Sequence, residues 1–144
     1  MRKSILLTMT CLLVLLVTVT RAGAITILHE FDSNRTSEDG YNPVHGSLVA
    51  DANGTMYGMT CFGGKYGVSL GNGTIFSITS DGTYTKLYDF GGIASDGYFP
   101  HGQLTLAGDY LYGMTAYGGS HSNGTIFKIK TDGTDYSILR SLSV

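Results

Sequence analysis

Cysteine is scarce in this 144-residue chain, which contains only Cys11 and Cys61. Cys11 falls in an N-terminal segment that we expect to be removed, so the remaining domain cannot form an intramolecular disulfide and must be held together by packing. Cys61 aligns with Ala116 in an internal repeat described below. This favours a small buried side chain at Cys61 over a nucleophilic thiol, because the sequence places no base beside it.

Clusters of basic residues are also missing. Three of the nine Lys and Arg residues lie before residue 24, and the rest of the chain carries six basic and eleven acidic side chains, a net charge of -5. Those six are scattered singly from Arg35 to Arg140. Binding to phosphates needs clustered Lys and Arg, so nucleic acid is not expected as a partner.

The N-terminus has the pattern of a secretory signal peptide. Arg2 and Lys3 precede an apolar run from Ile5 to about Val19, and the small residues Ala22-Gly-Ala24 follow it. The alternative is a retained membrane anchor, but threonines dilute the run and it is shorter than a confident span. We therefore expect a signal peptide at residues 1–24 and an exported domain at 25–144, secreted or at the cell surface, with membrane contact only through the signal segment.

Long apolar stripes at helical spacing are absent, and 21 residues are glycine. The segments between glycine-rich turns are short and rich in Thr, Ile, Tyr and Phe, which predicts strands. Asn53-Gly54, Asp81-Gly82 and Asp132-Gly133 each separate two such segments and predict two-residue hairpin turns. The first turn would join 47–49 to 56–60; the other two would join 74–79 to 84–90 and 125–130 to 136–142.

One block of sequence occurs twice. Asn53-Gly-Thr-Met-Tyr-Gly-Met-Thr-Cys-Phe-Gly-Gly64 returns as Gly108-Asp-Tyr-Leu-Tyr-Gly-Met-Thr-Ala-Tyr-Gly-Gly119, and each copy continues into Asn-Gly-Thr-Ile-Phe and Asp-Gly-Thr. Asp-Gly-Tyr-x-Pro precedes both copies, at Asp39 and Asp96. The offset between the copies falls from 57 to 51 residues along the alignment. The losses fall in predicted loops, so one supersecondary unit is repeated with its strands intact.

The expected fold is all-β, with two four-stranded antiparallel meanders arranged like partial or open propeller blades. The units would span 32–90 and 91–142, with a partial strand at 25–31, because Ile27-Leu-His-Glu-Phe31 matches Lys86-Leu-Tyr-Asp-Phe90 and, more loosely, Ile138-Leu-Arg-Ser-Leu142. Two blades cannot close a ring. The chain would then be a fragment of a longer array, which we favour, an oligomer, or an open stack whose exposed ends invite self-association.

The repeated motifs resemble the Gloeo/Verruco repeat of secreted bacterial proteins. The resemblance rests on Asp-Gly-x-x-Pro, Leu-Tyr-Gly-x-Thr-x-x-Gly-Gly, Asn-Gly-Thr-Ile-Phe and Leu-x-x-Phe, and it covers nearly all of residues 25–142. The family's usual Tyr-Gly-Thr-Thr is Tyr-Gly-Met-Thr in both copies here. The resemblance implies an exported tandem-repeat protein with a propeller-like fold, and it implies no particular reaction.

Repetition also explains most residues that could suggest chemistry. His45 and His101 recur between Pro and Gly, which favours turn residues bonded to backbone, and no zinc-ligand spacing is present. Asp39 and Asp96 recur before Gly, which favours turn-forming carboxylates over a calcium loop or a glycosidase pair. Gly63-Gly64 and Gly118-Gly119 favour backbone turns over a phosphate loop. We expect no catalytic residue, no metal and no cofactor.

The remaining candidates are aromatic residues in loops, which recur in matched pairs: Tyr41 with Tyr98, and Phe62 with Tyr117. Rings above a rigid β scaffold can bind sugars or peptides, although packing between the units would also explain them. We expect a non-catalytic exported module that binds a carbohydrate or protein. The alternatives are a fragment of a secreted propeller hydrolase or lyase and a purely structural spacer.

Overall fold

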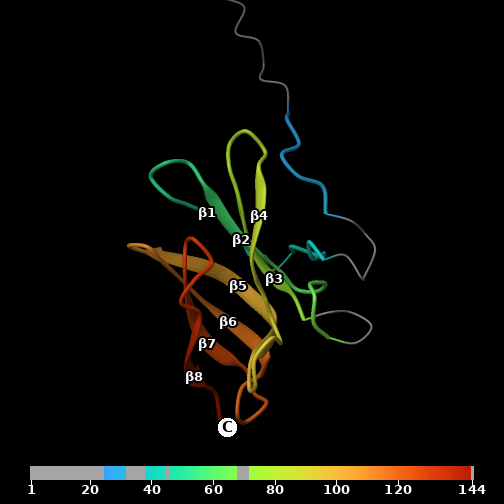
Figure 1. The fold of residues 1–144 in the computed structure, drawn as a ribbon, viewed down its shortest axis with the longest axis vertical. Helices are drawn as coiled ribbons and strands as arrows, with labels where there is room; N and C mark the ends of the chain where they lie inside the picture. The colour runs from blue at the N-terminus through green and yellow to red at the C-terminus, as the bar shows by residue number, and fades with distance from the viewer. Residues whose placement is uncertain (1–24, 32–37, 45, 68–71, 144) are drawn as a thin grey trace, which may run out of the picture.

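The computed structural model describes residues 25–31, 38–44, 46–67 and 72–143. As expected, it is all-β, with two four-stranded antiparallel sheets that do not close into a barrel (Figure 1). The first sheet contains β1 (Val49–Ala50), β2 (Met56–Thr60), β3 (Thr74–Ile78) and β4 (Tyr84–Asp89). The second contains β5 (Gly97–Ala107), β6 (Tyr110–Gly118), β7 (Thr125–Lys130) and β8 (Ser137–Ser141). Within the described residues no helix is long and apolar enough to cross a membrane.

Each sheet is a meander in which neighbours in sequence are neighbours in space. The two copies also share their register: Gly58 pairs with Phe76 in the first sheet, and Gly113 pairs with Phe127 in the second. A bulge in the last strand pair of each sheet falls at the same place, after Ile75 and after Ile126. The sequence repeat is therefore a structural repeat down to single residues.

The three predicted hairpin turns are present, but their predicted length was wrong. The pairs of residues that close these turns by backbone hydrogen bonds are Asp51 with Thr55, Thr79 with Thr83 and Lys130 with Thr134, which leaves three-residue loops. Only the last loop residue has positive φ, at Gly54, Gly82 and Gly133. A three-residue loop of this kind, a turn followed by a left-handed glycine, accepts Asn or Asp before the glycine at ordinary φ. A two-residue loop occurs instead at Gly108–Asp109, between Ala107 and Tyr110.

Two further strand predictions need correction. Residues 25–31 form no strand, although they lie beside β4 (Figure 1). The segment predicted at 47–49 contributes only Val49 to β1, whereas its counterpart β5 is a strand of 11 residues. β1 is short although it also faces the second sheet, because β5 contacts both β1 and β2.

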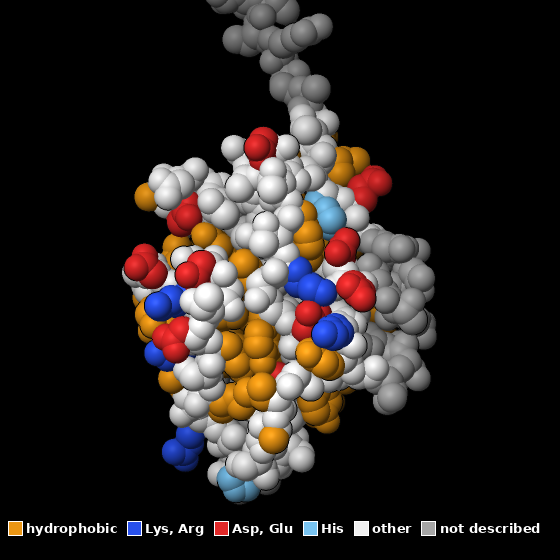
Figure 2. Space-filling model, viewed as in Figure 1, with side chains coloured by type: hydrophobic (Ala, Val, Ile, Leu, Met, Phe, Trp, Pro, Cys, Tyr) orange, Lys and Arg blue, Asp and Glu red, His pale blue; other side chains and the backbone are white. Residues whose placement is uncertain are grey.

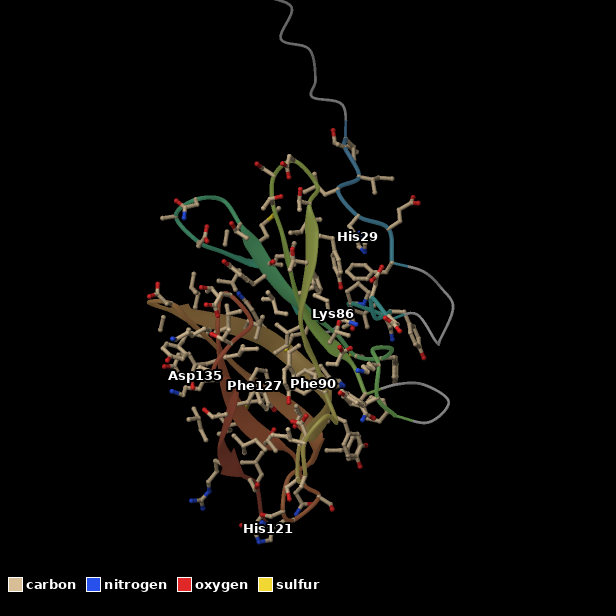
Figure 3. The ribbon with its side chains drawn as sticks, in the orientation of Figure 1. His29, Lys86, Phe90, His121, Phe127 and Asp135 are labelled. Carbon is tan, nitrogen blue, oxygen red and sulfur yellow. The ribbon has the colours of Figure 1, made fainter. Side chains whose placement is uncertain are left out.

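The core lies between the two sheets. The face of the first sheet that carries Tyr57 and Ile75 packs against the face of the second that carries Leu111 and Phe127. Phe90, at the end of β4, reaches across and lies beside Phe127 (Figure 3), with ring centroids 5.3 Å apart. In the space-filling view, hydrophobic side chains gather along the middle of the molecule with charged side chains on either side (Figure 2).

Two threonines join the repeated motifs within each sheet. The hydroxyls of Thr60 and Thr74 lie 2.8 Å apart in the first sheet, and those of Thr115 and Thr125 lie 2.8 Å apart in the second. All four side chains are buried. Each pair thus links the threonine of Tyr-Gly-Met-Thr to the threonine of Asn-Gly-Thr, and a buried hydroxyl must have such a partner.

Candidate functional site

The aromatic residues that the sequence predicts in loops come together at one edge of the molecule, but the loop prediction was wrong for Tyr98, which lies in β5, and for Tyr117, which lies in β6. Tyr41, which precedes β1 in the chain, lies in an isolated bridge with Phe62, which follows soon after β2. Tyr98 and Tyr117 pair across β5 and β6 at the corresponding place in the second sheet. The glycines that follow these rings, Gly63-Gly64 and Gly118-Gly119, all have positive φ, so the predicted turns are present there.

The rings form one continuous row across both sheets, which we call the aromatic row: Tyr41, Phe62, Phe99, Tyr98 and Tyr117. Tyr41 stacks on Phe62 with centroids 5.2 Å apart, and Tyr98 stacks on Tyr117 at 5.6 Å. Phe99 lies between these two pairs and meets Phe62 edge-on at 5.0 Å and Tyr117 edge-on at 5.7 Å. Tyr117 is the most open member, half exposed, and the other four are partly buried.

Phe99 is held in an unfavourable backbone conformation, with φ at 53°. A bulky side chain rarely adopts this left-handed region, and such strain costs about 1–3 kcal/mol. Its counterpart in the first sheet is Asn42, with φ at 63°, and asparagine tolerates that region far better. The protein thus bears the strain of a phenylalanine where its own repeat uses asparagine, and the result is a ring that connects the two halves of the row.

Phe99 is not predicted as a site residue from the sequence, because its counterpart in the first copy, Asn42, is not aromatic. The available signal was that mismatch itself: Asp-Gly-Tyr-Asn-Pro becomes Asp-Gly-Tyr-Phe-Pro in the second copy. The matched pairs predict Tyr41, Phe62, Tyr98 and Tyr117, and the structure brings all four together.

The recurring carboxylates have structural partners in the second copy. Asp96 is buried and its carboxylate accepts five hydrogen bonds, as expected of a turn-forming residue. Three come from the backbone of Gly91, Gly92 and Gly97. The other two come from the hydroxyls of Tyr88 at 2.8 Å and Tyr136 at 2.6 Å, one from each sheet. Asp96 therefore fastens the two sheets to each other.

Asp39, the counterpart of Asp96, is exposed. Its backbone carbonyl, rather than its side chain, accepts hydrogen bonds from the Tyr84 hydroxyl at 2.7 Å and from the Thr74 hydroxyl at 3.3 Å. Its neighbour Glu38 is also exposed. The backbone carbonyl of Glu38 accepts a hydrogen bond from the Lys86 ammonium at 2.9 Å.

A family model described as the Gloeobacter/Verrucomicrobia repeat matches residues 14–143. The chain belongs to this repeat family. No curated protein and no solved structure matches it. The Gloeobacter/Verrucomicrobia repeat thus accounts for both sheets and for the duplicated motifs, and the aromatic row lies on the edge where the two copies of its Tyr-Gly-Met-Thr segment end.

The other sequence candidates in this Gloeobacter/Verrucomicrobia repeat protein have separate surroundings. His101 lies in β5 opposite Met114, beside a register shift, so the prediction of a turn residue was wrong. His45 lies outside the described residues. Cys61 is buried, as predicted, and its thiol donates to the Pro100 carbonyl at 3.4 Å. In the described ranges no group of three or more His, Cys, Asp or Glu side chains could hold a metal ion.

The electrostatics of the described residues follow from burial and local hydrogen bonds. Burial raises the pKa of the Cys61 thiol. Burial, and then the hydrogen bond to Asp96, raises the pKa values of Tyr88 and Tyr136 well above their ordinary value. At the hairpin turns, hydroxyl donors from Thr79 and Thr134 lower the pKa values of Asp81 and Asp132. Each of these shifts is explained by contacts within the fold.

Proposed function

We propose that this protein is an exported, non-catalytic β-repeat module that binds a carbohydrate through the aromatic row. The observation that carries the proposal is Phe99, a strained residue whose ring makes the row continuous across both sheets. Backbone strain is retained where function repays its cost. Folding alone would be served by the asparagine that stands at the same place in the first copy.

The row suits a sugar ligand because its rings are rigid and partly open. Tyrosine and phenylalanine offer large apolar faces at a low entropic cost, and a tyrosine hydroxyl adds a polar contact at the rim. Tyr117, half exposed, supplies the most accessible ring of the row. The row is also uncharged, which fits a neutral ligand better than an ionic one.

The exported location and the propeller-like assembly belong to the same proposal. The N-terminal sequence supports export, since the segment before Ile25 has a signal peptide's charged start, apolar run and small-residue exit. Two consecutive antiparallel meanders packed face to face support blades of a propeller-like array. Expression of the full chain in a bacterial host, followed by N-terminal sequencing of the exported product, should give Ile25 as the first residue; an uncleaved N-terminus would contradict export by cleavage.

The binding proposal is tested with a glycan array probed with the purified protein and its variants. Tyr117→Ala should lower the signal on every bound glycan by about tenfold, the effect of losing roughly 1.4 kcal/mol of contact. Tyr66→Ala is the matched control, because Tyr66 is a loop tyrosine of comparable exposure, 38%, that lies outside the row. A blank array, or equal losses from the two variants, would contradict the proposal. Binding only to protein probes would replace the carbohydrate with a protein ligand.

The non-catalytic part of the proposal has its own assay. Each glycan bound on the array is incubated in soluble form with the protein, and released reducing ends are measured over time. We expect no release above that of a heat-denatured sample. Release that disappears with a single carboxylate substitution would instead identify an enzyme.

A further inference from the structure

The two sheets are held together by a strand end that one sheet donates to the next. Tyr88 and Phe90, from the end of β4, pack on the second sheet. Tyr88 stacks on Tyr136 with centroids 3.9 Å apart, and Phe90 meets Tyr136 edge-on at 6.2 Å and Phe127 edge-on at 5.3 Å. The turn at Gly133 lies against the same segment, since a Cβ there would be 2.9 Å from the Leu87 carbonyl oxygen.

Residues 27–31 make the same ring contacts on the first sheet. His29 stacks on Tyr84 at 4.1 Å, as Tyr88 stacks on Tyr136. Phe31 meets Phe76 edge-on at 5.1 Å, as Phe90 meets Phe127. A Cβ at Gly82 would be 3.0 Å from the Leu28 carbonyl oxygen. Residues 27–31 thus occupy the place of a preceding unit's strand end, although they form no strand.

A third segment of this kind, residues 138–142, has no further sheet to pack on in the described structure. Residues 138–142 align with 27–31 and 86–90, so Arg140 stands at the position of Tyr88 and Leu142 at the position of Phe90. Arg140 is exposed and lies on the outer face of the second sheet, opposite Ile126. Among the described residues, the segment 138–142 therefore packs on no further sheet.

The outer faces of the two sheets expose apolar side chains whose counterparts are covered at the interface between the sheets. Met114, on the outer face of the second sheet, is 52% exposed, whereas its counterpart Met59 is partly buried between the sheets. Leu48, on the outer face of the first sheet, is 49% exposed, whereas its counterpart Leu104 is 2% exposed. A cavity of about 420 Å³ lies between residues 27–31 and this outer face, lined by Leu48, Phe76 and Ile78 among others.

We propose that a second copy of this chain docks head to tail on the first sheet. The outer face of its second sheet, with Tyr112, Met114 and Ile126, covers Leu48 and Ile78, and its residues 138–142 replace residues 27–31. The contact extends the internal interface, because it joins the same kinds of face through the equivalent segment. The interface is heterologous, because it joins two different surfaces of the chain. Further copies added by the same contact would therefore close a ring or extend a filament.

Charge and polar contacts favour this occupant. Arg140 of the arriving copy takes the place of His29, where its guanidinium stacks on Tyr84 and pairs with the exposed carboxylate of Asp39, the counterpart of Asp96. Asp39 lies beside Tyr84, since the Tyr84 hydroxyl donates to the Asp39 backbone carbonyl at 2.7 Å; burial, and then the Asp39 charge, raises the pKa of Tyr84. His29 is also a weak occupant, since its buried Nε2 has no hydrogen-bond partner among the described residues.

Sedimentation velocity of the purified chain across a wide concentration range tests the proposal. The wild-type mass should rise with concentration. Met114→Lys should weaken association by about tenfold or more, because it places a charge in the apolar contact. Ile93→Lys is the matched control, since Ile93 is equally exposed, 53%, but lies on the loop between the sheets. Circular dichroism checks that both variants fold. A wild-type chain that stays monomeric, or equal behaviour of the two variants, would overturn the proposal.

A charge swap and hydrogen exchange define the geometry. Arg140→Asp and Asp39→Arg should each weaken association, and the double variant should restore it. On association, amide exchange should accelerate in residues 25–31 and stay unchanged in 86–90. Association that ignores the charge swap, or that leaves residues 25–31 protected, would indicate another contact and contradict the proposal.

Discussion

The rings of Tyr88 and Tyr136 stack with centroids 3.9 Å apart, and both hydroxyls donate to the carboxylate of Asp96. Tyr88 comes from the last strand of the first sheet, and Tyr136 immediately precedes the last strand of the second. This relationship shows how the repeat is joined: stacking aligns the strand ends, and a buried carboxylate fixes them. The Asp-Gly-Tyr motif that begins the second unit therefore belongs to the junction between units.

Substitution of Asp96 by asparagine should destabilise the protein by about 3 kcal/mol. The amide keeps one acceptor oxygen for the donors that now share the carboxylate, so buried N–H and O–H groups lose their partners. Urea unfolding followed by circular dichroism measures the loss. Asp39→Asn is the control, because Asp39 holds the same motif position but is exposed, and it should change stability by no more than about 0.5 kcal/mol. Equal losses would contradict this role for Asp96.

Substitution of Gly113 by alanine should cost about 1–3 kcal/mol, because a Cβ there would lie 2.5 Å from Phe127 Cζ and 3.0 Å from Leu104 Cδ2 in a packed core. Gly58→Ala should cost less. Its added Cβ would meet Phe76 and Leu48, and Leu48 is half exposed and free to move aside. Thermal unfolding of the two variants gives the comparison. A larger loss at Gly58 would show that the open face of the first sheet is packed as tightly as the core.

Stability should fall as the pH rises above 10. Burial, followed by the hydrogen bond to Asp96, raises the pKa values of Tyr88 and Tyr136 above their ordinary 10.0. A raised pKa means that the fold favours the neutral hydroxyl, so this contribution is complete below pH 10 and is lost as the pH rises toward the folded-state values. Urea unfolding between neutral and strongly alkaline pH measures the decline. The Tyr88→Phe/Tyr136→Phe variant should lose about 2 kcal/mol near neutral pH but decline less steeply above pH 10; an unchanged alkaline slope would contradict this origin.

The sequence predicted the architecture well because its signals are local. Short β-rich segments between glycine turns, written twice, are sufficient to predict two meanders. Of the six segments that the turns place as strands, all but 47–49 lie close to the observed strands, whereas β5 and β6 follow only from the repeat. The length of the hairpin loops was harder to predict from the sequence. Asn53-Gly54 fits two turn types, and the choice depends on which residues pair, here Asp51 with Thr55.

The site was predicted in part, for a physical reason. Matched pairs identified four rings of the aromatic row, but the strained Phe99 that connects them has no aromatic counterpart, and its φ cannot be read from sequence. The failure at residues 25–31 is similar. Ile27-Leu-His-Glu-Phe31 has the sequence of a strand end, and its rings lie where a strand end would place them, but the described chain provides no neighbouring strand to pair with it.

The end of β4 couples the two sheets, and a double-mutant cycle on Phe90 and Phe127 measures this coupling. Both side chains are fully buried, and their rings meet edge-on at 5.3 Å across the junction. Free energies of unfolding are measured for Phe90→Leu, Phe127→Leu and the double variant. We expect a coupling energy of at least about 0.5 kcal/mol between the two rings. Additive losses, with no coupling beyond experimental error, would contradict it.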